Sequence, residues 1–254
     1  MMSTAALLTR HSLPALCSLR RPLSTSAGSA ISQNLAQRCE DLPLKEAIAF
    51  KVNNVKWSYQ DLKEHSDALA AGLLELGWRS GDVLAVWVES DCQEQIVTRF
   101  ASSRAGLGLV EIDAGVSDPE SLRKILNETN AKGLVFDPVM GDRYNQDIVE
   151  AALPELASFD DRFGGRFRSR AVPSIGLVAH TGMDLVPGVV NLKHLLAYDA
   201  PESRFNSTTS GMKQVVSYGS GGGATSLKED EALQSAPWNL VSGILRQERQ
   251  LSEK

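Results

Sequence analysis

Apolar runs alternate with amphipathic segments along most of the chain, from about residue 45 to residue 200. The run Val83–Val88 is apolar throughout, which is typical of a strand that is buried on both faces. Three further strands are predicted over Leu107–Ile112, Gly133–Phe136 and Ser174–Val178. The segments between them have apolar residues at helical spacing. Because strands that alternate with helices are joined by right-handed crossovers, the pattern predicts an α/β fold with a mostly parallel sheet and helices on both faces.

Capping residues predict where the helices begin and end. Ser58, with Asp61 three residues later, begins a helix that Gly77 ends. Asp91 begins a second helix, and Asp118, which a proline follows, begins a third. Two short helices are also predicted, over Ile31–Cys39 and Asn145–Leu153. A small hairpin is predicted from strands over Ala47–Val52 and Val55–Trp57, with its turn at Asn53-Asn54.

The regular pattern ends near Glu202. Residues 206–225 are dominated by Ser, Thr and Gly, which is typical of a flexible loop. Another loop is predicted over Phe159–Arg170, which is rich in Gly and Arg, and a short terminal helix over Asn239–Arg249.

The N-terminal segment has the composition of a transit peptide. Its first 39 residues contain four arginines and many Ser, Ala and Leu, but no Asp or Glu. Arg10, His11 and Pro14 interrupt the apolar stretch, which disfavours a secretory signal, and a plastid is the main alternative destination. We therefore expect a mitochondrial transit peptide over residues 1–23, cut before Ser24, and a mature protein in the matrix or on the matrix side of the inner membrane.

Composition narrows the classes of function. The net charge of −5 and the pI near 5.5 provide no basic field for nucleic acid. No apolar run approaches the roughly 18 residues that span a bilayer. The three cysteines and four histidines are dispersed, in spacings that suit neither a disulfide framework nor a metal site.

Three single residues and one short motif could be functional, but each also has a structural or trivial interpretation. His65 lies on the apolar side of its predicted helix, as a packed histidine does, and Asp82 follows a glycine at a strand entry. Cys92 lies near a helix N-terminus, where a thiolate is favoured, so a redox role is a minor alternative. Asn206-Ser207-Thr208 is a glycosylation sequon that a matrix protein would not expose to the glycosylation machinery.

Five motifs in the same order resemble the front part of adenylate-forming enzymes, the AMP-binding or acyl-CoA synthetase family, and in particular the mitochondrial medium-chain acyl-CoA synthetases. They are WSYQDL at 57–62, LAAGLLELG at 69–77, GDVLAVW at 81–87, the segment 101–113, and AKGLVF at 131–136. The resemblance covers about residues 44–200. It implies an α/β subdomain over 45–200, preceded by a linker over 24–44 and followed by a tail over 201–254.

The resemblance also identifies a degenerate phosphate loop. The family's loop reads YTSGTTGxPKG, and the matching stretch here is YGSGGGATSLK at 218–228. Tyr218, Ser220 and Gly221 match, Gly222 and Gly223 replace two threonines, and Lys228 is one position late. Successive glycines can present N–H groups to an anion, but a Gly/Ser tether is the simpler interpretation. We identify these six residues as the candidate cofactor-binding set, with no catalytic residue and no metal ligand.

Three functions follow from the resemblance. The family activates a carboxylic acid with ATP and Mg²⁺ and passes the acyl group to coenzyme A. Its adenine and ribose segments and its catalytic lysine lie beyond the position that corresponds to Lys254. We therefore expect a non-catalytic scaffold or accessory subunit with protein partners in a mitochondrial assembly and no cofactor. The alternatives are a fragment or split acyl-CoA ligase that uses ATP, Mg²⁺ and CoA, and an acyl or nucleotide binding module without turnover.

Overall fold

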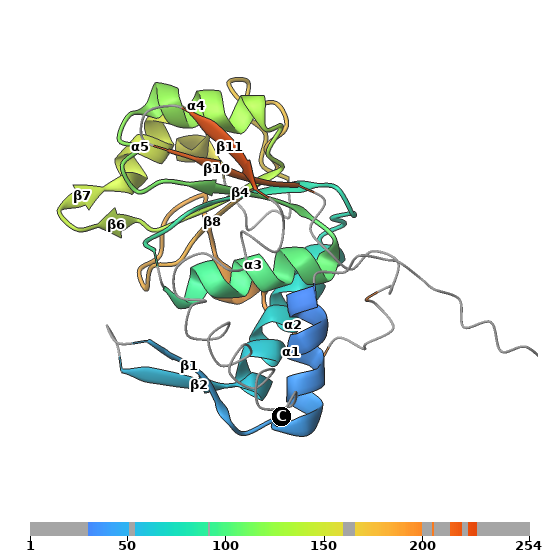
Figure 1. Cartoon of the computed structure of the whole chain (residues 1–254). Coiled ribbons are helices and arrows are strands. Elements are labelled where there is room, and N and C mark those ends of the chain that lie inside the picture. The colour runs from blue at the N-terminus through green and yellow to red at the C-terminus, as the bar shows by residue number, and fades with distance from the viewer. Residues whose placement is uncertain are drawn as a thin grey trace, which may run out of the picture.

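A computed structural model describes residues 30–50, 54–90, 92–159, 166–199, 205, 214–219 and 223–227. The predicted helix over Asn239–Arg249, the transit peptide and the sequon at Asn206 lie outside these residues. Within them, the chain forms helical layers on the two sides of a central sheet (Figure 1). None of the described helices is long and apolar enough to cross a membrane.

The central sheet has seven strands in the order β11-β10-β4-β3-β5-β8-β9. All neighbouring strands are parallel except the pair β10–β11, which confirms the predicted mostly parallel sheet. Its strands are β3 (Val83–Trp87), β4 (Gly108–Ile112), β5 (Gly133–Phe136), β8 (Leu177–His180), β9 (Val190–Asn191), β10 (Gln214–Tyr218) and β11 (Ala224–Leu227).

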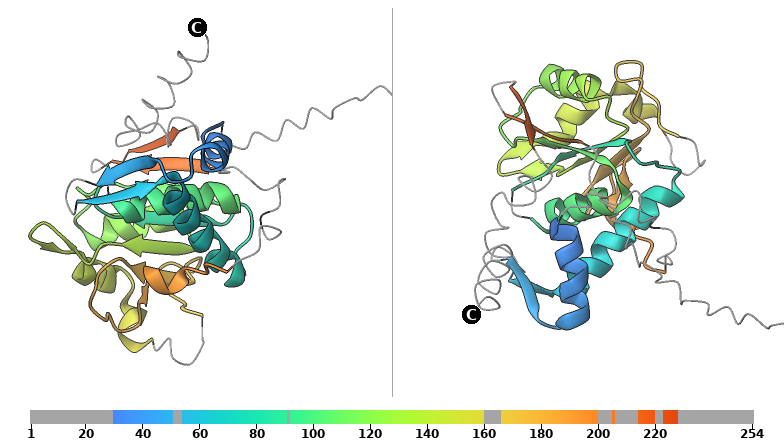
Figure 2. Two further views of the ribbon diagram at one scale, coloured as in Figure 1. Left: turned by 90° about the horizontal axis from the view of Figure 1, so that it is seen from below. Right: turned by 45° about the vertical axis from the view of Figure 1, so that its right-hand side comes forward.

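Two hydrophobic cores lie on opposite faces of the sheet. The first contains Leu84 and Val86 of β3 and packs against α1 (Ala30–Asp41), α2 (Tyr59–Glu75) and α3 (Gln93–Ala105). The second contains Ala85 and Trp87 and packs against α4 (Pro119–Glu128), α5 (Asn145–Ala152) and the 3₁₀ helix η1 (Pro154–Ser158). The right-hand view of Figure 2 shows α4 and α5 on one side of the sheet and α1 to α3 on the other. A strand with apolar residues on both faces therefore requires these two layers.

The predicted caps of α2 and α4 are confirmed. The Ser58 hydroxyl accepts from the Asp61 N–H at 3.2 Å, and the Asp61 carboxylate accepts from the Ser58 N–H at 2.8 Å, which completes a capping box. The Ser58 hydroxyl also donates to the Asp61 carboxylate at 2.7 Å, and this bond, followed by the one from the Ser58 N–H, lowers the pKa of Asp61. Asp118 caps α4 through the Ser121 N–H, and Gly77 ends α2 with a φ of +80°.

The start of α3 corrects one prediction. The N-cap is Cys92 rather than Asp91, because the Cys92 sulfur accepts a hydrogen bond from the Gln95 N–H at 3.3 Å. Asp91 lies outside the described residues. Burial raises the pKa of the Cys92 thiol far above its usual range, so the thiol is protonated and the redox alternative loses its physical basis.

Several other predictions are confirmed, and some are shifted. The small hairpin forms from β1 (Glu46–Phe50) and β2 (Val55–Ser58), and α1 occupies the predicted short helix. The strand predicted from Ser174 begins instead at Leu177. The loop predicted over residues 206–225 is wrong at its end, because β10 and part of β11 lie there. The pattern also missed the short pair β6 (Val139–Met140) and β7 (Arg143–Tyr144) and the 3₁₀ helix η3 (Leu192–Leu195).

A buried ion pair joins α3 to the sheet. The Arg99 guanidinium binds both carboxylate oxygens of Glu111 on β4, and its Nη2–Oε2 distance is 3.0 Å. The side chains of Arg99 and Glu111 are only 5 % and 13 % exposed. Two such charges remain in an apolar layer only when each neutralises the other, so this contact fixes α3 over β4.

Gly72 allows α2 to approach η3 closely. A Cβ atom at Gly72 would lie 1.6 Å from the Leu195 carbonyl oxygen, a backbone atom that side-chain movement cannot remove. The Ala197 N–H also donates to the Ala68 carbonyl at 3.0 Å, which holds the two segments together. The glycine is therefore required by the packing of η3 on α2 rather than by the helix itself.

Replacing Gly72 with alanine tests this packing. We expect Gly72→Ala to lower the free energy of unfolding by about 1–3 kcal/mol, because the overlap outweighs the better helix propensity of alanine. Urea unfolding followed by circular dichroism measures the change. Gly176→Ala is the matched control, since a Cβ there would meet its nearest atom at 3.9 Å. Equal stability of the two variants would contradict the close approach.

Candidate functional site

The carboxyl ends of the parallel strands meet at one edge of the sheet. The chain passes from β3 to β4 on one side and from β5 to β8 on the other, so the strand order reverses between β3 and β5. Ligands of open α/β sheets bind at such a reversal, outside the carboxyl ends of the strands. This carboxyl edge is therefore the candidate site.

The described ends of the predicted phosphate loop lie at this edge. Strands β10 and β11 form an antiparallel hairpin in which Tyr218 pairs with Ala224, and the Gly219 N–H donates to the Gly223 carbonyl at 3.2 Å. The Asp113 N–H, directly after β4, donates to the Tyr218 carbonyl at 2.9 Å. The structure thus places Tyr218 and Gly223 at the two ends of the loop.

The other four predicted residues, Ser220, Gly221, Gly222 and Lys228, lie outside the described residues. At the described ends of the loop there is open space, because a Cβ atom added at Gly219 or Gly223 would meet no atom within 4 Å. The Gly219 N–H is not available to a phosphate group, since it is already bonded across the hairpin.

Tyr218 contributes to the wall beneath the loop. Its side chain is buried on the face that carries α4, where it closes a cavity of about 110 Å³ lined also by Ser117, Ser121 and Lys124. Burial, and then the carboxylate of Glu128, raise the pKa of Tyr218. The phenol is therefore neutral at physiological pH and acts as a packed wall residue rather than as a base.

Asp137, directly after β5, holds three segments of the edge together. Its carboxylate accepts from the Glu89 N–H at 2.6 Å and from the Thr181 hydroxyl. Its backbone carbonyl accepts from the buried Asn145 amide at 3.0 Å. Because both carboxylate oxygens are occupied by internal donors, Asp137 positions the loops after β3 and β8.

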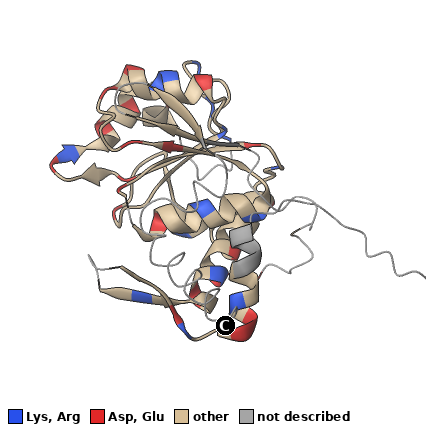
Figure 3. Cartoon of the chain, in the orientation of Figure 1, with Lys and Arg blue, Asp and Glu red and all other residues tan. Residues whose placement is uncertain are grey.

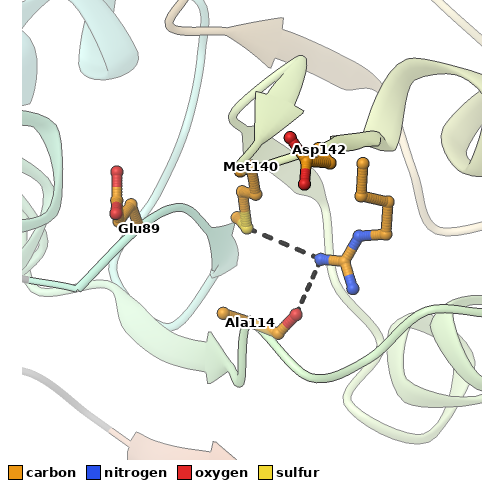
Figure 4. A pocket seen from close by; sticks show the side chains of 6 residues that line it. Glu89, Ala114, Met140 and Asp142 are labelled. Carbon is orange, nitrogen blue, oxygen red and sulfur yellow. Dashed lines mark hydrogen bonds between the residues drawn. The ribbon is translucent and has the colours of Figure 1, made fainter.

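A cavity of about 550 Å³ opens beside these loops, between the ends of β3 and β4 and the β6–β7 hairpin (Figure 4). The Arg143 guanidinium donates to the Ala114 carbonyl and to the Asn145 amide oxygen, at 2.6 Å each, and lies over the Trp87 ring. The cavity also contains the acids Glu89 and Asp142. Arg143 was not predicted from the sequence, because it lies on a strand of two residues without a motif.

Two histidines are packed against other side chains of the fold. His65 packs between Trp57 and Tyr198, and its Nδ1 lies 2.9 Å from the Tyr198 hydroxyl, which confirms the packed histidine predicted from the sequence. His180 ends β8 and is 1 % exposed, and burial lowers its pKa, so its ring is neutral. Among the described residues, no three His, Cys, Asp or Glu side chains are placed to hold a metal ion.

The family model for "AMP-binding enzyme" matches residues 35–163, just over half of the chain. The match includes β3, β4 and β5 of the central sheet and ends before the β10–β11 hairpin. The family match therefore does not extend to the hairpin that carries Tyr218 and Gly223.

Curated relatives match a longer segment. The mitochondrial medium-chain acyl-CoA ligase ACSF2 of Mus musculus is 28 % identical over 180 residues, which cover 71 % of this chain and 28 % of that protein. The acyl-CoA ligase sidI of Aspergillus fumigatus is 32 % identical over 108 residues, or 42 % of this chain and 18 % of that protein. The chain thus spans less than a third of the length of these relatives.

Solved structures share the fold. A fatty acyl CoA synthetase of Mycobacterium tuberculosis superposes with a TM-score of 0.55 at 17 % identity, over 78 % of this chain and 34 % of that one. The N-terminal domain of FACL13 from the same organism gives 0.56 at 16 % identity, over 78 % and 43 %. The matched sequence model and this shared α/β architecture lead to one conclusion: the chain belongs to the AMP-binding enzyme family and is similar to acyl-CoA synthetases.

Proposed function

We propose that this chain is a non-catalytic acyl-CoA-synthetase-like protein that acts as an accessory subunit of a mitochondrial assembly. One observation carries the proposal: several polar side chains described at the carboxyl edge are occupied by the protein itself. Asp137 binds Glu89 and Thr181, Arg143 binds Ala114, and Tyr218 is buried. Transition-state stabilisation needs donors aimed at the reacting group, and Gly222 and Gly223 replace the hydroxyls that the family resemblance implies.

Exposed apolar side chains at the same edge support a role in binding a protein partner. Val139 and Tyr144 on the β6–β7 hairpin are 51 % and 66 % exposed, and Met183 and Leu185 after β8 are 84 % and 87 % exposed. The two segments are adjacent, because a Cβ atom at Gly182 would lie 2.9 Å from the ring of Pro138. Grouped apolar side chains of this size are typical of a surface that another protein covers.

An acyl-CoA ligase activity is the second candidate, and the hairpin favours it. The β10–β11 hairpin carries its loop to the carboxyl edge, and open space above Gly219 and Gly223 leaves room for the phosphates of ATP. Such a ligase would use Mg²⁺ and CoA, and the relatives named as medium-chain ligases make a medium-chain carboxylate the first substrate to test. Binding of acyl or nucleotide groups without turnover is the intermediate case.

Pyrophosphate exchange separates these functions. We expect the purified chain to show no carboxylate-dependent exchange between pyrophosphate and ATP with Mg²⁺ and fatty acids of increasing length, because the edge offers few free donors. The mouse ligase serves as the positive control. Exchange that requires the carboxylate would contradict the accessory role and establish the ligase. Calorimetry with ATP, AMP and acyl-CoAs then identifies binding without turnover.

The exposed apolar group can be tested by sizing. We expect the chain from Ser24 onward to self-associate when it is purified alone, because Met183 and Leu185 lie in water. The double variant Met183→Ser/Leu185→Ser should shift elution toward the monomer. Leu44→Ser is the matched control, since Leu44 is 82 % exposed but belongs to the segment before β1. A stable monomer of the unmodified chain would count against the partner surface.

Location in mitochondria is supported by two observations. The first 39 residues are basic and contain no acid, and several relatives are named as mitochondrial. We expect these residues to direct a fused fluorescent protein to mitochondria, and the variant with Arg10, Arg20 and Arg21 changed to serine to stay diffuse. A fusion of residues 24–39 is the negative control. Fluorescence in plastids or in the secretory pathway would refute the location.

A further inference from the structure

A second cavity lies at the opposite edge of the sheet, where the strands begin. It measures about 590 Å³ and is lined by Leu74, Gly77, Trp78, Arg79, Asp82, Lys132 and Arg166. Asp82 directly precedes β3 and Lys132 directly precedes β5, so the cavity belongs to the amino edge. The length of the strands separates it from the phosphate loop at the carboxyl edge.

One wall of this cavity is held rigidly. The Lys132 ammonium forms an ion pair with the Asp82 carboxylate and lies 5.1 Å from the centre of the Trp78 ring. The Arg79 N–H donates to the same carboxylate at 2.7 Å. The Trp78 ring is fixed by Gly133, where a Cβ atom would lie 2.8 Å from two ring carbons. Both donors bind the Oδ2 atom of Asp82, and this carboxylate balances one positive charge.

Two further guanidinium groups line the cavity, and their positive charges are not balanced by a described carboxylate. Arg79 and Arg166 are exposed, and no described carboxylate forms an ion pair with either side chain. Arg166 crosses from the segment before β8 to α2, since its Nη2 lies 3.5 Å from the position of a Cβ atom at Gly77. With three cations and one acid, the lining has a net charge of +2 in a chain whose net charge is −5. Basic and acidic residues are otherwise interspersed over the described ribbon (Figure 3).

We propose that the amino-edge cavity binds a small anion that carries two or more phosphate charges, such as a diphosphate group. The planar guanidinium presents paired N–H donors that match phosphate oxygens, and two of them match a divalent anion better than a single carboxylate. The size of the cavity limits the ligand to a small molecule. The site is independent of the phosphate loop, so it does not depend on whether the chain catalyses acyl activation.

Calorimetric titration of the full chain with inorganic pyrophosphate, in buffer without Mg²⁺, tests the site. We expect Arg79→Gln/Arg166→Gln to raise the dissociation constant for pyrophosphate at least about tenfold. The loss of even one hydrogen bond from a charged donor is enough to weaken binding by this factor. Arg79→Lys/Arg166→Lys should retain part of the affinity. Equal urea midpoints show that the exposed substitutions leave the fold intact.

Two controls locate the binding. Lys56→Gln removes an exposed cation on β2 and should leave the affinity unchanged. Gly222→Asp adds a negative charge to the phosphate loop and should also have no effect on binding at the amino edge. Loss of binding in Gly222→Asp but not in the double arginine variant would overturn the proposal. So would the absence of heat with pyrophosphate, or equal affinity for pyrophosphate and citrate.

Discussion

The parallel pairing of β10 with β4 is the constraint on which the carboxyl-edge site depends. Gln214 pairs with Gly108 and Tyr218 with Ile112, and the Asp113 N–H extends the ladder to the Tyr218 carbonyl. Among the described strands, β11 pairs with β10 alone, so the backbone pairing of the hairpin with the rest of the sheet runs through β4. The two strands are far apart in sequence, and closing such a long loop costs chain entropy that the pairing and the burial of Tyr218 have to offset. Tyr218 and Gly219 would otherwise have no fixed position relative to Asp113 or α4.

Strand β4, which pairs with β10, is itself held in place by an ion pair. Glu111 of β4 lies opposite Ser217 of β10 and binds Arg99 of α3 on the face of the first core. A buried carboxylate without a partner would be strongly destabilising, so α3, β4 and the hairpin are coupled through this ion pair. The two edges of the sheet then differ in chemistry. At the carboxyl edge Asp137 and Arg143 are bound to the protein, whereas at the amino edge Arg79 and Arg166 line a cavity whose one described acid, Asp82, is paired with Lys132.

Local signals explain which elements could be predicted from the sequence. The apolar run of β3 and the caps Ser58 and Asp118 act within a few residues, and the structure confirms them. Strand β10 could not be predicted in this way, because Ser and Gly surround Val215, Val216 and Tyr218 and its strand form comes from pairing with β4. Cys92 replaces the expected Asp91 because a partly buried sulfur can also accept the capping bond. The amino-edge cavity joins side chains from three distant segments, which no local motif records.

Glycine in the loop favours binding or assembly over turnover. Gly221, Gly222 and Gly223 follow one another, and each glycine loses more backbone entropy on ordering than any other residue. Their N–H groups can still meet an anion that is present at high concentration. Catalysis requires preorganised donors, because they must already be in place when charge develops in the transition state. Under the proposed accessory role, a loop in which glycines replace two hydroxyls loses rate before it loses contact with an anion. The α/β scaffold then keeps its surfaces for a partner.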